Sequence, residues 1–326
     1  MRFLRLSTYF NYYSRVGKDP KFWHILLLLP RIVAIPKRGN FSIFNRFYRA
    51  NRLSNDLIWT RAELPEIEAL FVVAGKDLDI LPESIAQVLL TSLNPIKCIS
   101  IIVPEKDLEN CKVKLIDISK NENIKIISED KYLSDSFRLK IKRTFGARYG
   151  WVVQQLLTVE FVYKSKSQGV LMVNADTMIL RNIQWVDSLG NQVLMASNEF
   201  HKPYYKLLCD IGLIEKDPNY TFVTHHMLFQ PQLLHAVLDQ LQVKNLEAFF
   251  DLVLDHVDTK ILSPLCIEFE LYAQGILRFF PTQVLMRKFA NIGMKRLSGN
   301  LEIADQIKKL KKEGDYNSVS MHSYLI

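Results

Sequence analysis

The 326-residue sequence has little cysteine and few residues that interrupt regular structure. Its four cysteines, Cys98, Cys111, Cys209 and Cys266, are scattered and form no C-x-x-C pair. This spacing argues against a disulfide framework or a structural zinc site, and it favours a reducing compartment. With only 12 glycines and 12 prolines, the composition is not that of a fibrous or low-complexity protein. We therefore expect one globular chain.

Long apolar runs and an export signal are also missing. The apolar run from Ile25 to Leu29 ends at Pro30 and is far shorter than the roughly 20 residues that a membrane-spanning helix needs. Residues 1–5 are followed by aromatic and polar residues instead of an apolar core with a cleavage site, so they do not form a signal peptide pattern. These absences predict a cytoplasmic protein.

Three common active-site motifs are absent as well. The sequence contains no G-x-G-x-x-G, no G-x-x-x-x-G-K-[ST] and no G-x-S-x-G. The first two would place phosphates at a helix N-terminus, and the third would expose a nucleophilic serine. Neither a Rossmann dinucleotide site, nor a P-loop, nor a serine hydrolase is therefore indicated.

Positive charge is in excess and is concentrated at the start of the chain. The net charge is +8, and the basic residues between Arg2 and Arg52 are balanced only by Asp19 and Asp56. Aromatic residues alternate with them over residues 1–62. This segment is either a cap that packs its aromatics on the main domain or a surface that docks on the cytoplasmic face of an anionic inner membrane. No nucleic-acid-binding module is recognisable, so we expect no nucleic acid partner.

A regular alternation of strands and helices begins after Pro65, and we therefore divide the chain into an extension at 1–62 and one domain at 63–326. Apolar runs bounded by glycine or proline predict parallel strands, and amphipathic segments between them predict crossover helices. The strands are expected at 68–74, 98–103, 124–127, 170–173 and 192–196. Helices are expected at 82–93, 147–164, 232–241 and 246–254, with a further helix opened by Ser263-Pro264.

The all-apolar strand at 170–173 is the most informative of these elements. It delivers Asn174-Ala175-Asp176 at its carboxyl end. Ligands of open α/β sheets bind beyond the carboxyl ends of the strands, so Asp176 is expected to project into a binding site. Asx residues also cap strands and turns, and this reading of Asp176 stays open beside the functional one.

Four segments together resemble the motifs of a bacterial family grouped with the GT-A glycosyltransferases. They are Gly150 to Leu157 (GWVVQQLL), Val173 to Thr177 (VNADT), His225 to Phe229 (HHMLF) and Glu268 to Tyr272 (EFELY). The resemblance covers the chain from about Glu68 onward. It implies an α/β, GT-A-like fold with a mixed, mostly parallel sheet flanked by helices. It also implies transfer of a sugar from a nucleotide-diphosphate donor to a cell-surface polysaccharide, a lipopolysaccharide or a lipid-linked glycan.

The same resemblance implies a metal site for Mn²⁺ or Mg²⁺. Asp176 is the expected ligand from a D-x-D-type motif, and His322 corresponds to a C-terminal metal-binding histidine. Asn174 stands where the family pattern has aspartate. An amide can accept a hydrogen bond but carries no charge, so the metal dependence stays open.

Catalytic or acceptor-orienting roles fall on Glu268, Glu270 and His226. The resemblance places a carboxylate of this kind at the fourth motif. In a helix the two glutamates point to nearly opposite sides, so at most one of them should face the cleft, and we favour Glu268. His225 and His226 also diverge, so one is expected to be structural and the other to bind the acceptor.

Candidates for binding the donor follow the first strand and surround the helix at 147–164. Polar or charged side chains at these places can contact a base, a ribose or a diphosphate. Together with Asn174 and Asp176, the set is Ala74, Lys76, Asp77, Arg143, Arg148 and Gln155.

Two other functions remain compatible with the sequence. A nucleotidyltransferase also uses an α/β sheet and a divalent metal, although its usual Gly-rich basic loop is not seen after residue 74. A catalytically degenerate protein that binds a sugar nucleotide, or a scaffold docked on a membrane, would tolerate Asn174.

Overall fold

The computed structural model describes residues 49–59, 62–120, 122–261, 263–297 and 299–323. Most of the basic, aromatic segment at 1–62 lies outside these residues, so both readings of it remain predictions. None of the helices within the described ranges has the length and apolar character that a bilayer span requires.

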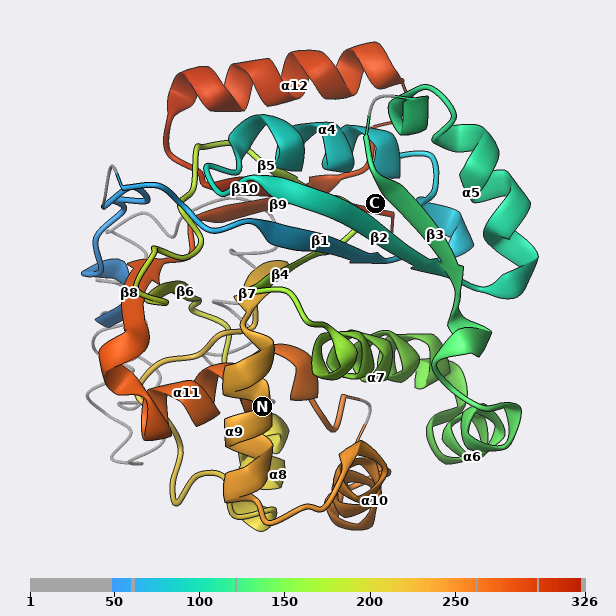
Figure 1. Ribbon diagram of the computed structural model, residues 1–326, viewed down its shortest axis with the longest axis vertical. Coiled ribbons are helices and arrows are strands. Elements are labelled where there is room, and N and C mark those ends of the chain that lie inside the picture. The colour runs from blue at the N-terminus through green and yellow to red at the C-terminus, as the bar shows by residue number, and fades with distance from the viewer. Residues whose placement is uncertain (1–48, 60–61, 121, 262, 298, 324–326) are drawn as a thin grey trace, which may run out of the picture.

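A five-stranded sheet forms the centre of the molecule (Figure 1). Its strands, in spatial order, are β3 (Ile124–Ser128), β2 (Ile96–Val103), β1 (Ile67–Val72), β4 (Val170–Val173) and β7 (His226–Phe229). The first four run parallel, and β7 pairs antiparallel with β4. The predicted α/β class with a mixed, mostly parallel sheet flanked by helices is therefore confirmed.

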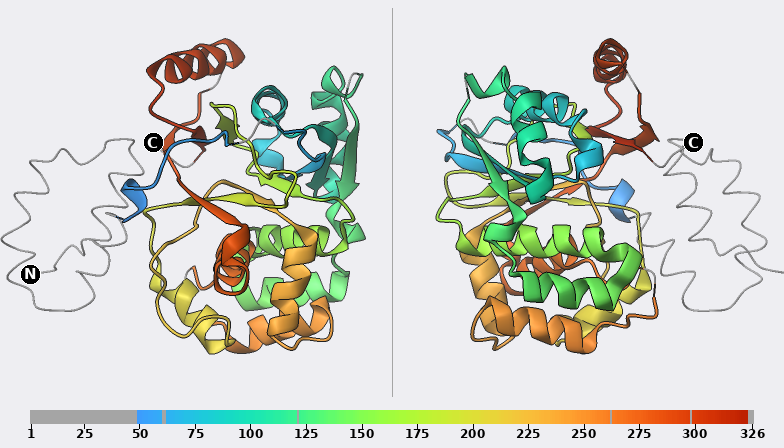
Figure 2. Two further views of the ribbon diagram at one scale, coloured as in Figure 1. Left: turned by 60° about the vertical axis from the view of Figure 1, so that its left-hand side comes forward. Right: turned by 90° about the vertical axis from the view of Figure 1, so that its right-hand side faces the viewer.

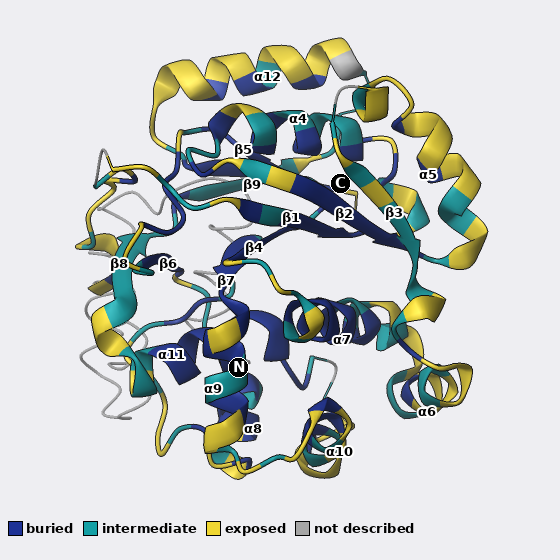
Figure 3. Ribbon diagram, viewed as in Figure 1, coloured by how far each residue is buried: buried dark blue, intermediate teal, exposed yellow. Residues whose placement is uncertain are grey.

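Both faces of this sheet are covered, which explains why its strands are nearly continuous apolar runs. Leu70 and Met172 belong to the core shared with the helix at 149–164, whereas Phe71 and Val173 belong to the core under the helix at 81–91. Side chains alternate between the two faces along a strand, so neighbouring residues enter different cores. Figure 3 shows the inner strands and most of the helix at 149–164 as buried, whereas the outer helices at 108–114 and 300–313 expose much of their surface.

The helices lie in two layers, one on each side of the sheet (Figures 1 and 2). The layer above the sheet in Figure 1 contains α4 (Leu81–Thr91), α5 (Leu108–Lys114) and α12 (Asn300–Glu313). The layer below contains α6 (Asp135–Phe145), α7 (Tyr149–Lys164), α8 (Lys202–Asp210), α9 (Pro231–Gln240), α10 (Leu246–His256) and α11 (Tyr272–Phe279).

Two smaller sheets complete the architecture. In one, β10 (Ser318–His322) lies between β5 (Thr177–Ile179) and β9 (Asn291–Lys295). In the other, β6 (Gln192–Ala196) pairs with β8 (Val284–Lys288), so the predicted strand at 192–196 exists but lies outside the central sheet. Since β5 follows β4 almost directly, the sheet containing β10 is held close to the carboxyl end of β4.

The helix expected to start at Ser263-Pro264 begins later than predicted. Residues 264–266 are not helical, a π-helix, η6, spans Ile267–Leu271, and α11 follows. Cys266 has φ −145° and ψ 77°, which is incompatible with a helix. The Ile267 amide donates to the side-chain oxygen Oε1 of Gln155 at 2.8 Å, so a residue of a neighbouring helix satisfies this backbone amide.

Short 3-10 helices follow β1 and β2 and precede α7. They are η1 (Gly75–Asp77), η2 (Glu105–Asp107) and η5 (Gly146–Arg148).

Candidate functional site

Asp176 projects from the turn that ends the interior strand β4. The Thr177 amide donates to the Asn174 carbonyl at 2.9 Å and closes the turn, while the Met321 amide donates to the Asp176 carbonyl at 2.8 Å. This second bond sets His322 beside the carboxylate, with Nδ1 3.0 Å from Asp176 Oδ2. The side chain of Asp176 is 18% exposed, and that of His322 is 11% exposed. Asp176 is thus neither sealed in the core nor placed on an open surface.

Four polar side chains meet here, and we call Asn174, Asp176, His225 and His322 the Asp176 cluster. Burial alone would raise the pKa of Asp176, but the hydrogen bond from His322 and the nearby His225, His322 and Arg296 together lower it. The carboxylate therefore stays ionised at neutral pH. Burial lowers the pKa of His225 to about 4 against the opposing effect of Asp176, so this imidazole is neutral.

The two adjacent histidines have different surroundings. The His225 ring lies 5.3 Å from that of His322, centroid to centroid. His226 is buried on the opposite side, where its ring meets Trp185 edge-on and its Nε2 lies 3.2 Å from Ser318 Oγ. Burial lowers its pKa to about 3. The sequence predicts a catalytic role for His226, whereas the structure places His225 beside Asp176.

Asn174 is fully engaged by its neighbours. Gln154 Nε2 donates to Asn174 Oδ1 at 3.1 Å, and Asn174 Nδ2 donates to His225 Nδ1 at 3.2 Å. The amide thereby connects α7 to the chain entering β7 across the end of β4. An aspartate could not donate to His225 and would require the imidazole to donate from Nδ1 instead.

The Asp176 and His322 pair fits one edge of a divalent cation site. Metal–ligand bonds of about 2.1 Å at right angles put two ligand atoms about 3 Å apart, close to the separation of Asp176 Oδ2 and His322 Nδ1. A cation bound here would replace the proton that Nδ1 now donates to the carboxylate. Within the described ranges, no group of three or more His, Cys, Asp and Glu residues is arranged to hold a metal ion. A cation held by Asp176 and His322 would have to take its remaining ligands from elsewhere, and Mg²⁺ commonly takes them from a bound phosphate and water.

Arg296, which follows β9, joins the loop after β1 to the Asp176 cluster. Its guanidinium pairs with Asp77, donates from Nη1 to the Lys76 carbonyl at 2.8 Å, and donates from Nε to the Met321 carbonyl at 3.2 Å. Asp77 is thus already paired, whereas Ala74 and Lys76 are exposed at the same edge. No sequence signal marks Arg296, since its partners are far away in the chain.

Asp107, at the end of η2, is a second polar residue that the sequence analysis missed. A Cβ atom added to Gly75 would lie only 2.7 Å from Asp107 Oδ2, so the carboxylate rests directly against the Gly75 backbone. Asp107 Oδ2 is buried and has no hydrogen-bond partner among the described residues. Buried carboxylate oxygens normally accept hydrogen bonds, so the missing partner sets this oxygen apart from most buried polar atoms.

The other donor-side candidates lie elsewhere. Gln155 is 1% exposed and turned into the core, where it accepts from Ile267. Arg143 is exposed on α6. Arg148 precedes α7, and its guanidinium lies over the Trp151 ring, 5.8 Å from the centroid.

The two glutamates on η6 are both buried. Their side chains point in different directions, as expected, and each meets another helix. Glu268 interacts with Thr158 of α7, and Glu270 accepts a hydrogen bond from Tyr205 of α8 at 2.7 Å. Glu270 also accepts from the Phe222 amide at 2.6 Å and from Gln274 at 2.9 Å. Burial raises the pKa of Glu268 to about 8 and that of Glu270 to about 7. Glu268 is only 5% exposed and Glu270 not at all, and Glu268 Oε2 has no hydrogen-bond partner among the described residues. The assignment of a catalytic or acceptor-orienting role to Glu268 therefore stays a prediction.

Several solved structures are similar to the chain. Mouse xyloside xylosyltransferase 1 matches with a TM-score of 0.41 and 9% identity over 79% of this chain and 98% of its own. The galactosyltransferase LgtC, in complex with donor and acceptor sugar analogues, matches with a TM-score of 0.41 and 11% identity over 79% of this chain and 87% of its own. The bifunctional glycosyltransferase WbbM matches with a TM-score of 0.45 and 10% identity over 84% of this chain and 48% of its own. No protein-family model and no curated protein matches the sequence significantly.

Proposed function

We propose that the chain is a glycosyltransferase that takes a sugar from a nucleotide-diphosphate donor at the Asp176 cluster. The observation that supports it is the ionised Asp176 carboxylate, paired with His322 at the carboxyl end of an interior strand. Ligands of open α/β sheets bind at this edge, and a single carboxylate with an imidazole is suited to a cation shared with phosphates. In this proposal, bound Mn²⁺ or Mg²⁺ stabilises the negative charge that develops on the leaving diphosphate.

The residues of the chain have separate tasks in this proposal. Asp176 and His322 hold the cation, and the neutral His225 is held by Asn174 next to them. Arg296 fixes the loop after β1 through Asp77 and the Lys76 carbonyl. Asp107 packs against the Gly75 backbone beside the neighbouring strand ends, and its carboxylate accepts a hydrogen bond from the nucleoside when the donor is bound. The donor diphosphate would then span from Gly75 to Asp176.

Acceptor identity rests on the family resemblance alone. It favours a cell-surface polysaccharide, a lipopolysaccharide or a related lipid-linked glycan. An acceptor of this kind, with the basic segment at 1–62, is compatible with peripheral attachment to the cytoplasmic face of the inner membrane. Donor choice and acceptor choice are therefore separate experimental questions.

A panel of UDP-, GDP-, CMP- and dTDP-sugars, each with and without Mn²⁺, tests the proposal by thermal unfolding. A ligand at 100 times its dissociation constant stabilises the folded state by about 2.7 kcal/mol. We expect one nucleotide class to raise the melting temperature, and to do so more strongly with Mn²⁺. The control is His322→Gln, which should lose the added effect of Mn²⁺. An unchanged melting temperature across the panel would contradict the proposal.

A protein that binds the donor without turnover is the second candidate, because both polar atoms of the Asn174 amide are occupied by neighbours. Release of free nucleotide from the stabilising donor separates the two. Slow hydrolysis in the absence of acceptor is expected of the transferase, whereas binding with no release favours the degenerate protein. A nucleotidyltransferase would instead release pyrophosphate from a nucleoside triphosphate.

A further inference from the structure

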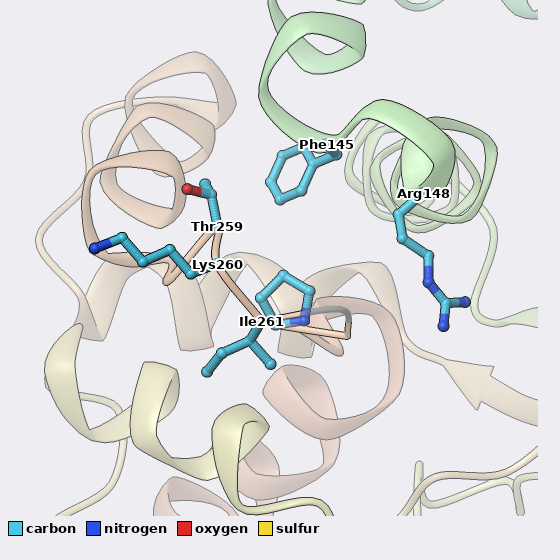
Figure 4. A pocket seen from close by; sticks show the side chains of 6 residues that line it. Phe145, Arg148, Thr259, Lys260 and Ile261 are labelled. Carbon is cyan, nitrogen blue, oxygen red and sulfur yellow. The ribbon is translucent and has the colours of Figure 1, made fainter.

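A cavity of about 190 Å³ lies between the start of α7 and the loop that follows α10 (Figure 4). One side is formed by Phe145 and Arg148, and the facing side by the loop. The loop residues that line it are Thr259, Lys260, Ile261 and Pro264. Pockets for drug-sized ligands run from about 300 to 1,000 Å³, so this cavity suits one sugar ring or a small anion but not a nucleotide.

The cavity is connected to the Asp176 cluster through α7. Arg148 immediately precedes this helix, and Gln154, six residues further on, donates to Asn174 at 3.1 Å. Six residues of α-helix rise about 9 Å, so the cavity lies roughly that far from Asn174 along the helix axis. The N-terminus of α7 extends beyond the carboxyl end of β4, the side on which the proposed donor binds.

Arg148 gives the cavity its chemical character. Within the described ranges, no carboxylate lies within ion-pair distance of its guanidinium, although it stacks over Trp151. Figure 4 shows the ammonium group of Lys260 turned away from Arg148. A guanidinium binds carboxylate or phosphate through two parallel hydrogen bonds, and the ring of Phe145 with Ile261 offers an apolar surface beside it. An anionic group attached to a body with apolar faces would match both features.

We propose that this cavity binds an acidic sugar unit of the acceptor, with Arg148 pairing its carboxylate or phosphate. This inference rests on the proposed glycosyltransferase function and adds a class of acceptor to it. The acidic unit is one further along the glycan than the unit that receives the transferred sugar, because Arg148 lies about 9 Å along α7 from the residue that contacts Asn174. Arg148 therefore serves the acceptor and not the donor diphosphate.

Titration of the intact protein with D-glucuronate, D-glucose 6-phosphate and D-glucose, followed by ligand-observed NMR, tests this site. A charge-assisted hydrogen bond contributes about 1.5 to 3 kcal/mol, so at least one acidic sugar should bind tenfold or more tightly than glucose. The Arg148→Gln variant should bind all three equally. Lys142→Gln removes one exposed positive charge from nearby α6, outside the cavity, and should keep the preference.

Filling the cavity provides an independent readout. Ile261 lines the cavity and is partly exposed, so Ile261→Trp should weaken binding of all three sugars without unfolding the protein. Preference for glucuronate or for glucose 6-phosphate identifies the acidic group as carboxylate or phosphate. Equal binding of the three sugars by the unmodified protein, or a preference that survives Arg148→Gln, would overturn the inference. None of these titrations requires a nucleotide or Mn²⁺, so their failure is separable from failure of the donor panel.

Discussion

Acidic side chains occupy two contrasting regions of this molecule, the end of β4 and the π-helix η6. Asp176 keeps part of its surface open and has its pKa lowered by His322 and other nearby groups. Glu270 is fully buried, accepts three hydrogen bonds, and has its pKa raised to about 7. A charged carboxylate with spare ligand capacity can serve chemistry, whereas a buried one with every acceptor used serves the fold. The opposite directions of the two pKa shifts agree with this division.

The strongest test of this contrast removes the buried carboxylate. Glu270→Ala leaves Tyr205, the Phe222 amide and Gln274 without their acceptor and opens a cavity, so we expect a loss of about 3 to 5 kcal/mol in the free energy of unfolding. Glu270→Gln keeps the shape and most of the hydrogen bonding, and should cost about 1 kcal/mol. Urea unfolding measures both. Equal losses of unfolding free energy in the two variants would show that the hydrogen bonds to Glu270 do not account for the loss of stability.

The matching change at the other region should affect activity and spare stability. Asp176→Asn keeps the shape but removes the charge that we propose holds a cation, so kcat/KM for the donor should fall about 10² to 10³-fold. Its free energy of unfolding should stay within about 1 kcal/mol of the unmodified protein, since the side chain is not sealed in the core. Asp305→Asn, on the exposed side of α12, is the matched control and should behave as the unmodified protein. Full activity of Asp176→Asn would place the chemistry elsewhere.

The pH dependence of stability also tests this contrast. The raised pKa of Glu270 determines whether the free energy of unfolding rises or falls with pH. The folded pKa of Glu270, about 7, lies above the ordinary glutamate value of 4.5. The stability it confers is therefore fully present below the ordinary value and is lost as the pH rises through 7. At about 1.4 kcal/mol per pKa unit, the free energy of unfolding should fall by roughly 2 kcal/mol between pH 5 and pH 8 because of this group. Glu270→Gln should show a shallower fall, and an unchanged slope in that variant would assign the effect to other groups.

Much of the central sheet could be predicted because its signals are local. The strand at 170–173 and the helix ending at Lys164 agree with β4 and α7 to within two residues. Small elements such as α5, β9 and β10 were missed, since their apolar residues are few and are buried only by distant partners. The late start of the helix near residue 264 depended on a side chain of α7 and had no local sequence signal.

The candidate site was predictable to a smaller extent. Strand-end placement pointed to Asp176, and the family resemblance pointed to His322, which does lie beside it. Sequence alone could not choose between His225 and His226, because adjacent residues diverge and the pairing of β7 with β4 decides which one meets Asp176. Arg296 and Asp107 act through contacts with Asp77 and Gly75 that only the tertiary structure creates.

The Asp176 and His322 pair joins residues 146 positions apart. Contacts of such long sequence separation form slowly in folding, because a large loop must close before they can be made. A chain refolding from denaturant should thus recover its helical signal before the proposed cation site forms. Recovery of donor binding would then show when the native topology is complete. The formation of this pair can therefore be used to time the last step of folding.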